Sequence, residues 1–269
     1  MSRRWIAAAA ILSACLSATG AHASMDWHFA SSSGNSTGTS WGNQRSWTSD
    51  GVTVTATAWA NTGGSDASVS ADQQVIRSAY LGWWGGSGLG VTNRDGGNQS
   101  YKDQHEGDAQ YGEHATDNNQ RYDTVLLSFS EAVKLESLKL GWLANDSDMT
   151  VLAYTGAADG APLAGLQYQG LLASGWELIG HYANLTTNVD KLINPDNVVS
   201  SFWLIGAFNP LVGGTTPNDA GAGNDYVKLA AVGASRAPTP PQGNVPEPGS
   251  LILAALGISG LLRMRRRAA

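Results

Sequence analysis

The strongest structural signal in the chain is the stretch VTVTATAW, residues 52–59, in which valine or alanine alternates with threonine up to a final tryptophan. A period of two directs alternate side chains to opposite faces, so this stretch predicts a half-buried β-strand. Runs rich in β-branched, aromatic and aliphatic residues predict further strands at 125–129, 133–142, 150–154, 176–182, 201–208 and 225–232.

The segment 133–142 contains a break in its own alternation. Val133 and Leu135 share one face, whereas Leu138, Leu140 and Trp142 follow in the shifted register. One extra residue at Glu136-Ser137 would return both sets to the same face, and a β-bulge supplies such a residue. We therefore expect a bulge there.

Polar, glycine-rich segments separate the predicted strands, and the chain has 33 glycines and no long helical periodicity. Segment 72–84 suits either one helical turn or an extended strand. The roughly 220 residues between the two ends fit one large domain with about eight to ten strands. The predicted fold class is all-β: an antiparallel, jelly-roll-like β-sandwich formed by residues 24–235.

The glycine-rich segment 85–98 contains Gly88-Leu89-Gly90-Val91. It lacks the G-K-[ST] ending of a phosphate-binding loop, and no helix is predicted after it. Its glycines are expected to serve turns that need positive φ.

Charge is distributed unevenly along the chain. The ends hold six of the 16 basic residues and one of the 22 acidic residues, so residues 24–245 carry a net charge of −11. Such a body should repel nucleic acid and anionic lipid, which excludes nucleic acid as an expected partner.

Residues 1–23 have the form of a secretory signal. Arg3 and Arg4 precede an apolar stretch, and Ala21 and Ala23 form an A-x-A cleavage site that would leave Ser24 as the first residue. The expected partners for export are the Sec translocon and signal peptidase.

Cys15 is the only cysteine, and it lies inside this signal. The exported body would therefore contain no disulfide, thiolate zinc site or catalytic thiol. Leu12-Ser13-Ala14-Cys15 also fits a lipoprotein processing box, in which Cys15 would be lipidated. That alternative remains open.

The C-terminus has three parts after a proline-rich linker at 236–244. An uncharged apolar run at 250–262 is predicted to form a single hydrophobic helix of roughly 20 Å, shorter than the ~30 Å hydrocarbon core of a membrane. The residues before this run are Val245, Pro246, Glu247 and Pro248, and those after it include Arg263, Arg265, Arg266 and Arg267. The arginines would hold the end on the cytoplasmic side.

This order of parts over residues 245–269 resembles the PEP-CTERM sorting signal. The resemblance implies recognition and removal by exosortase, a membrane-embedded enzyme. It also implies a Gram-negative bacterium that makes exopolysaccharide. The protein would be held transiently in the inner membrane and then pass to the cell surface or the extracellular (biofilm) matrix.

Residues 88–142 contain a second pattern: Gly88-Leu89-Gly90-Val91, His114, Asp117-Asn118, Asp123, the strand 125–129 and Gly141. This pattern resembles a family of exosortase-dependent surface proteins, whose fold is expected to be a β-sandwich. The ending at 225–229 is similar to that of many tagged proteins. The resemblance implies no catalytic role.

Two polar clusters, 113–118 and 145–148, lie beside predicted strands. If these strands are neighbours, Asp117, Asn118, Asp146 and Asp148 would present oxygen ligands suited to calcium, the one cofactor the sequence suggests. The alternative is that these residues form and cap turns. For His114, too, the alternative to a role in a site is a role in a turn.

Trp83 and Trp84 are adjacent, and neighbouring residues of a strand face opposite sides. One of the two indoles would then be available to stack on a sugar ring. The alternative is that both pack in the core or at an edge.

No established catalytic motif is present. Gly85-Gly86-Ser87-Gly88 lacks the spacing of a nucleophile elbow, and no histidine pair has the spacing of a zinc site. The expected function is a non-enzymatic structural or interaction protein of the surface or matrix. A calcium-stabilised carbohydrate-binding module, with exopolysaccharide as partner, is the alternative, and a glycan-active enzyme is a third reading.

Overall fold

The computed structural model describes residues 24–63, 74–94, 114–157, 160–221 and 223–237. The chain divides into two compact units, Met1–Arg236 and Ala237–Ala269. The predicted secretory signal, the apolar run 250–262 and the arginine cluster lie outside the described residues. The account below concerns the first unit.

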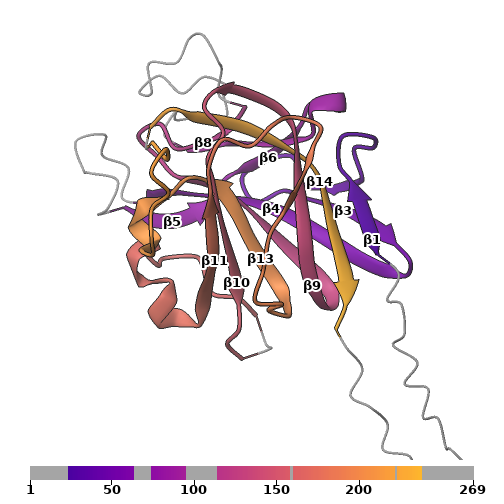
Figure 1. Ribbon diagram of the computed structural model, residues 1–269. Helices are drawn as coiled ribbons and strands as arrows, with labels where there is room; N and C mark the ends of the chain where they lie inside the picture. The colour runs from indigo at the N-terminus through magenta and orange to yellow at the C-terminus, as the bar shows by residue number, and fades with distance from the viewer. Residues whose placement is uncertain (1–23, 64–73, 95–113, 158–159, 222, 238–269) are drawn as a thin grey trace, which may run out of the picture. The chain divides into compact units, whose positions relative to one another are not determined.

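The unit is built from antiparallel strands joined into one sheet of 14 strands, which confirms the all-β prediction (Figure 1). The strands are β1 (Met25–His28), β2 (Asn35–Thr37), β3 (Gln44–Ser49), β4 (Val52–Gly63), β5 (Val75–Ser78), β6 (Tyr80–Trp83), β7 (Leu89–Thr92), β8 (Thr116–Asp117), β9 (Asp123–Asn145), β10 (Met149–Tyr154), β11 (Trp176–Tyr182), β12 (Asp190–Leu192), β13 (Ser200–Ala207) and β14 (Asp225–Arg236). The helices among the described residues are single 3-10 turns: η2 (Gly85–Ser87), η3 (Tyr168–Gly170), η4 (Leu172–Ser174) and η5 (Pro210–Val212).

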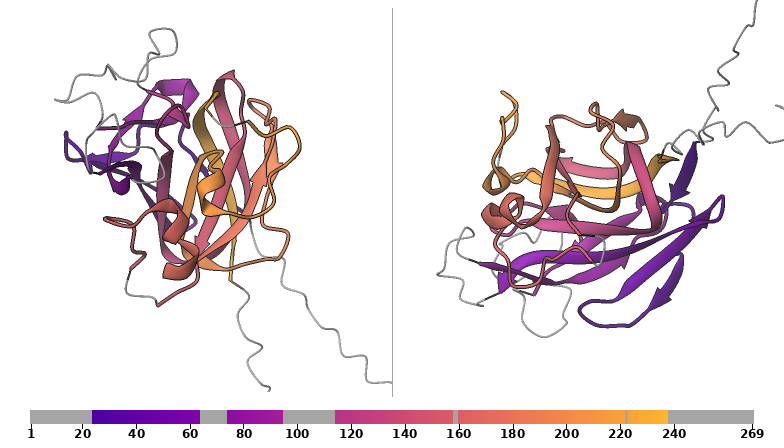
Figure 2. Two further views of the ribbon diagram at one scale, coloured as in Figure 1. Left: turned by 90° about the vertical axis from the view of Figure 1, so that its left-hand side faces the viewer. Right: turned by 90° about the horizontal axis from the view of Figure 1, so that it is seen from below.

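The sheet curls into two layers because β9 runs through both of them (Figure 2). The first part of β9 lies between β13 and β4, in a layer that continues to β10 and β11 on one side and to β3 and β2 on the other. The second part of β9 lies between β12 and β14. The far edge of β14 pairs in turn with β8, β7 and β1.

The bulge predicted in β9 is present. Ser137 pairs with Gly233 and Leu135 with Ala234, so Glu136 is the extra residue. As expected, the side chains of Val133, Leu135, Leu138 and Leu140 then all face the core.

Trp142 does not join this face, contrary to the prediction. A second register shift leaves Gly141 unpaired, because Trp142 pairs with Lys228 while Leu140 pairs with Leu229. This shift turns Leu143 toward the core and Trp142 toward the opposite face.

The main core fills the space between the two layers. It takes alternate residues of β4 and the buried faces of β9, β10, β13 and β14, and its largest members are Trp27 and Trp203. The alternation of residues 52–59 is confirmed, since Val52, Val54, Ala56 and Ala58 are fully buried.

A second apolar cluster covers the outer face of the first layer. Leu126, Leu152 and Leu204 project away from the main core and pack beneath Tyr168 and Leu171 of the η3–η4 segment. Strands β9, β10 and β13 are thus buried on both faces here, which explains why their sequences are almost continuously apolar.

Several strands were not predicted. β2 and β3 lie in a serine- and threonine-rich segment in which β2 is exposed and no residue of β3 is fully buried, so burial leaves little pattern there. The segment 85–98 was expected to be turns throughout, and this was wrong for Leu89–Thr92, which form the buried strand β7. Gly85 (φ +53°) and Gly88 (φ +95°) do have the positive φ expected of turn glycines.

Within the described ranges, no helix has both the length and the apolar character required to cross a membrane.

Gly90 provides a test of the close packing around β7. A Cβ atom at Gly90 would lie 2.0 Å from the carbonyl oxygen of His114, whereas one at Gly86 would meet nothing within 4 Å. We expect Gly90→Ala to lower the free energy of unfolding by about 1–3 kcal/mol, as overpacked sites do. Gly86→Ala should change it by less than about 0.5 kcal/mol. Urea denaturation followed by tryptophan fluorescence measures both, and equal stabilities would contradict this packing.

Candidate functional site

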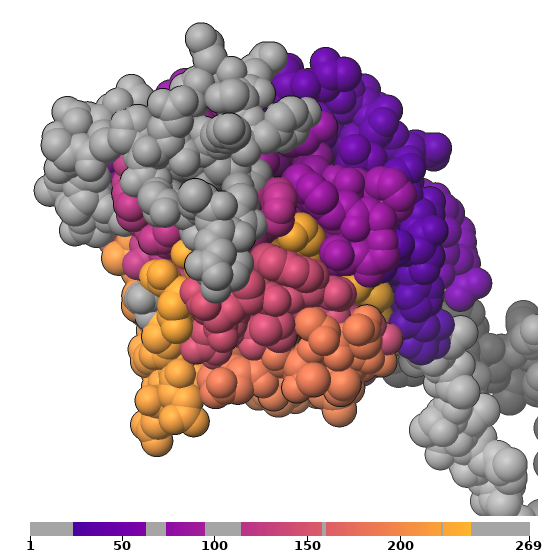
Figure 3. Space-filling view, turned by 90° about the horizontal axis from the view of Figure 1, so that it is seen from above, coloured from indigo at the N-terminus to yellow at the C-terminus, as the bar shows by residue number. Residues whose placement is uncertain are grey.

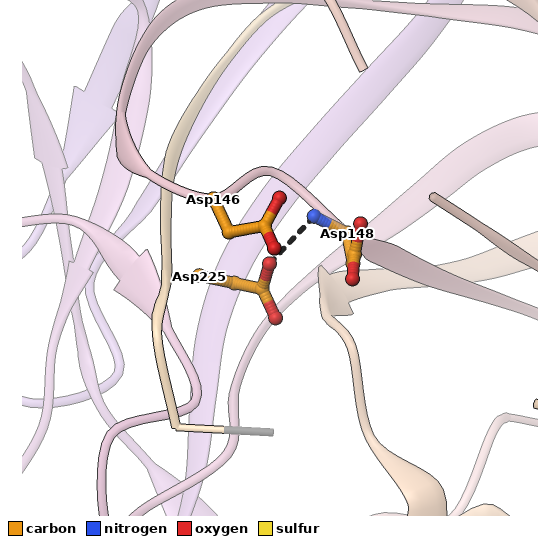
Figure 4. Close-up of side chains that lie close together, drawn as sticks. All are labelled: Asp146, Asp148 and Asp225. Carbon is orange, nitrogen blue, oxygen red and sulfur yellow. Dashed lines mark hydrogen bonds between the residues drawn. The ribbon is translucent and has the colours of Figure 1, made fainter. Parts of the chain in front are cut away.

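The densest group of titratable side chains, the carboxylate cluster, lies where β9 turns into β10, next to the start of β14. Asp146 and Asp148 belong to that turn and Asp225 begins β14, and an oxygen of each lies within 4.8 Å of the others (Figure 4). Asn145 adopts a positive φ of 55°, a conformation that asparagine tolerates and that allows the chain to reverse there. The rose segment around residues 140–150 and the orange-to-yellow segment leading into β14 lie side by side at this end (Figure 3).

Asp225 has no exposed surface. Its Oδ1 accepts a hydrogen bond from the backbone N–H of Asp148 at 2.6 Å. Its Oδ2 accepts one from the side-chain amide of Asn118 at 2.5 Å. Asn118 Oδ1 accepts in return from the N–H groups of Gly223 and Asp225. The two side chains therefore fasten the β8 loop to the start of β14.

The other two carboxylates also accept hydrogen bonds from the chain itself. Asp148 accepts from the backbone N–H of Asn184 at 2.7 Å and from that of Gly221 at 3.0 Å. Asp146 accepts from the N–H of Ser147 at 2.8 Å and from the amide of Asn224 at 3.3 Å. The group thus joins several loops that are distant in sequence.

Burial dominates the electrostatics of these carboxyl groups. Loss of solvent raises the pKa of Asp225 to about 7, against the lowering effect of its hydrogen bonds to Asp148 and Asn118. The pKa of Asp148 is also raised, first by burial and further by the charges of Asp146 and Asp219. No lysine or arginine of the described residues forms an ion pair with any of the three carboxylates.

The structure brings together three of the four residues predicted to bind calcium: Asn118, Asp146 and Asp148. Asp117 is placed differently, since it pairs with Tyr226 in the β8–β14 ladder and its Oδ1 accepts from the N–H of Asn119. Asp225 was missed as a site residue. One feature of the sequence could have identified it. An acidic residue stands at the first position of the predicted strand 225–232, and a buried strand position is expected to hold an apolar residue.

The aromatic pair lies on β6 and just beyond it. Trp83 is 36% exposed, and its indole N–H donates to the carbonyl of Phe29. Trp84 is partly buried, and its ring lies against Gly82, where a Cβ atom would be 1.7 Å from the ring. Trp83 is therefore the more accessible of the two predicted sugar-stacking residues.

Trp84 belongs to a different group, the lysine–aromatic cluster, together with His114, Trp142 and Lys228. The ammonium of Lys228 lies 3.6 Å from the Trp142 ring centroid and 5.6 Å from that of Trp84. Such cation–π contacts replace part of the lost hydration of the ammonium group. Burial nevertheless lowers the pKa of Lys228 to about 8. Burial and the charge of Lys228 also lower the pKa of His114.

Comparison with known proteins identifies the C-terminal tail. Residues 244–267 match the family model of the PEP-CTERM protein-sorting motif, which confirms the resemblance seen in the tail. The motif is the signal that exosortase recognises, and it implies export, transient anchoring in the membrane and display at the surface. No curated protein and no solved structure matches the chain. The resemblance of residues 88–142 to a surface-protein family therefore stays a prediction.

Lys228 makes stability depend on pH in a direction that can be measured. The unfolded chain keeps this proton up to about pH 10.5, whereas the folded protein loses it near pH 8. Between these values the unfolded state binds more protons, so the Lys228 contribution to stability rises with pH. Relative to Lys228→Met, the wild type should gain on the order of 1–3 kcal/mol from pH 8 to pH 10.

Urea titrations at the two pH values measure this change. Lys139→Met, which removes a surface lysine paired with Asp190, is the matched control. A constant difference between the wild type and Lys228→Met would show that Lys228 keeps an ordinary pKa.

Proposed function

We propose that the protein is a non-enzymatic structural or interaction component of the cell surface or extracellular matrix of a Gram-negative bacterium. It would reach that place by Sec export, signal peptidase cleavage and exosortase processing. The observation that carries the proposal is the sorting motif at residues 244–267, attached to a separate all-β unit. Exopolysaccharide is the partner expected in such a matrix.

The carboxylate cluster supports a structural role over a catalytic one. A carboxyl group with a raised pKa beside a second carboxylate is also what a glycosidase requires. Asp148 and Asp225, however, have no exposed surface. A substrate oxygen cannot reach them in this conformation, and their oxygens already accept hydrogen bonds from the chain's own donors.

The second candidate function is a carbohydrate-binding module stabilised by calcium. Three carboxylates with no basic partner among the described residues concentrate negative charge. The buried Oδ1 of Asn224 accepts no hydrogen bond from the described part of the chain, while the same side chain donates to Asp146. Carboxylate and amide oxygens are the ligands that calcium prefers. A calcium ion would offset the repulsion that burial and mutual proximity create.

Alanine replacement of Pro246, Glu247 and Pro248 tests the sorting role. Because the motif is the exosortase signal, we expect the variant to remain in the membrane fraction at the mass of the unprocessed precursor. The wild type should appear as a shorter product. Mass spectrometry of membrane and released fractions from the native host measures this. Replacement of Pro240 and Pro241, which lie outside the matched residues, is the control and should be processed normally. Normal processing of the motif variant would refute the sorting role.

Calcium addition after EDTA treatment tests the second candidate. A ligand that binds only the folded state at 100 times its Kd adds about 2.7 kcal/mol, which raises Tm by several degrees. Asp225→Asn should abolish the increase, whereas Asp196→Asn, the same change at an exposed position, should retain it. Differential scanning calorimetry measures the shift. An unchanged Tm in the wild type would exclude the calcium site.

A further inference from the structure

A groove of about 450 Å³ lies beside β5, and none of the carboxylate-cluster residues lines it. Arg77 of β5 and Arg94, which follows β7, both line it, together with Trp59 of β4 and Val75. Two arginines in one groove are unusual in this protein, because its body has a net charge of −11.

The backbone around the groove is held on both sides. On one side β5 pairs with β4, where Ser78 lies opposite Trp59 and Arg77 opposite Ala60. On the other side Ile76 donates to the carbonyl of Leu166 at 2.7 Å and accepts from the N–H of Gly165 at 2.9 Å. The groove is therefore formed by paired backbone, which favours a fixed geometry.

Arg94 is fixed in place without being neutralised. Its Nε donates to the Ser78 carbonyl at 2.5 Å and its Nη2 to the Ser78 hydroxyl at 2.7 Å. Its guanidinium lies 5.4 Å from the Trp41 ring centroid. These partners are all uncharged, and its Nη1 has no acceptor among the described residues.

The Arg77 side chain is exposed, and its guanidinium makes neither a hydrogen bond nor an ion pair with any described residue. Burial, and then the nearby positive charge of Arg77, lowers the pKa of Arg94. The two guanidinium groups thus repel each other, and an anion bound between them would relieve that repulsion. Guanidinium groups match the planar geometry of a carboxylate especially well.

Trp59 supplies an apolar surface in the same groove. Its ring packs on the second apolar cluster and also borders the groove. Its indole N–H already donates to the Thr57 hydroxyl at 2.9 Å, so its remaining contribution to a ligand is apolar contact. Indole rings stack well on the apolar faces of sugar rings.

We propose that this groove binds a sugar unit that carries a carboxylate, such as a hexuronic acid residue of an acidic polysaccharide. Arg77 and Arg94 hold the carboxylate, and Trp59 contacts the sugar ring. The proposal gives a ligand class to the interaction role described above. It depends on neither the sorting motif nor calcium, so its failure would leave both of those tests unaffected.

Calorimetric titration of the purified full chain in mild detergent tests the proposal. The probes are trigalacturonate, triglucuronate and trimannuronate, with maltotriose as the neutral control. At least one uronate should bind, maltotriose should not, and 0.5 M NaCl should weaken the binding because exposed charges are screened. Arg77→Gln should reduce the affinity about tenfold, as expected when one charged hydrogen-bond partner is lost.

Arg236→Gln is the matched control, because it removes the same charge from an exposed arginine that pairs with Glu131. Its affinity should equal that of the wild type. Absence of binding to all three uronates would overturn the proposal. So would equal affinity for maltotriose, or an unchanged affinity in Arg77→Gln.

Discussion

β9 carries the constraint on which the rest of the fold depends, because its backbone must pair on both edges in two different layers. Its first part lies between β4 and β13, and its second part lies between β12 and β14. The extra residues Glu136 and Gly141 let the strand bend and twist as it passes from one layer to the other. The same path brings the end of β9 beside the start of β14, where the loops rich in aspartate and asparagine meet.

The carboxylate cluster and the lysine–aromatic cluster show different ways to bury an ionisable group. Asp148 and Asp225 keep their hydrogen-bond capacity satisfied by N–H donors, so burial raises their pKa values without leaving an oxygen unpaired. The Lys228 ammonium instead lies against aromatic faces, and its pKa falls. Gly82 contributes to the second arrangement, since only a residue without a side chain leaves room for the Trp84 ring.

Which face of a strand is buried was predicted correctly where one face is buried and the other is exposed. Residues 52–59 and the bulge at Glu136 follow from alternation alone, because burial imposes the period of two. Trp142 was placed on the wrong face because a glycine bulge leaves no trace in an apolar pattern. β2 and β3 were missed because none of their residues is fully buried, so no alternation marks them.

Only part of the candidate site was predicted, because one of its residues lies outside the polar loops. Asn118, Asp146 and Asp148 stand in polar loops, where site residues are usually sought. Asp225 opens a buried strand, and its role depends on a pairing between residues 145 and 225 that no local pattern encodes. The arginine groove joins residues from β4, β5 and the end of β7, and it was not anticipated for the same reason.

The pairing of β14 has a mechanical consequence for a protein whose tail is a sorting signal. A pull on the chain beyond Arg236 is transmitted first to β14. This strand is bonded to β9 over residues 225–236, and near its end it is also bonded to β1. Removing β14 from the sheet therefore requires the ladders on both of its edges to open. Tension applied through the tail thus meets the most extensively paired part of the sheet.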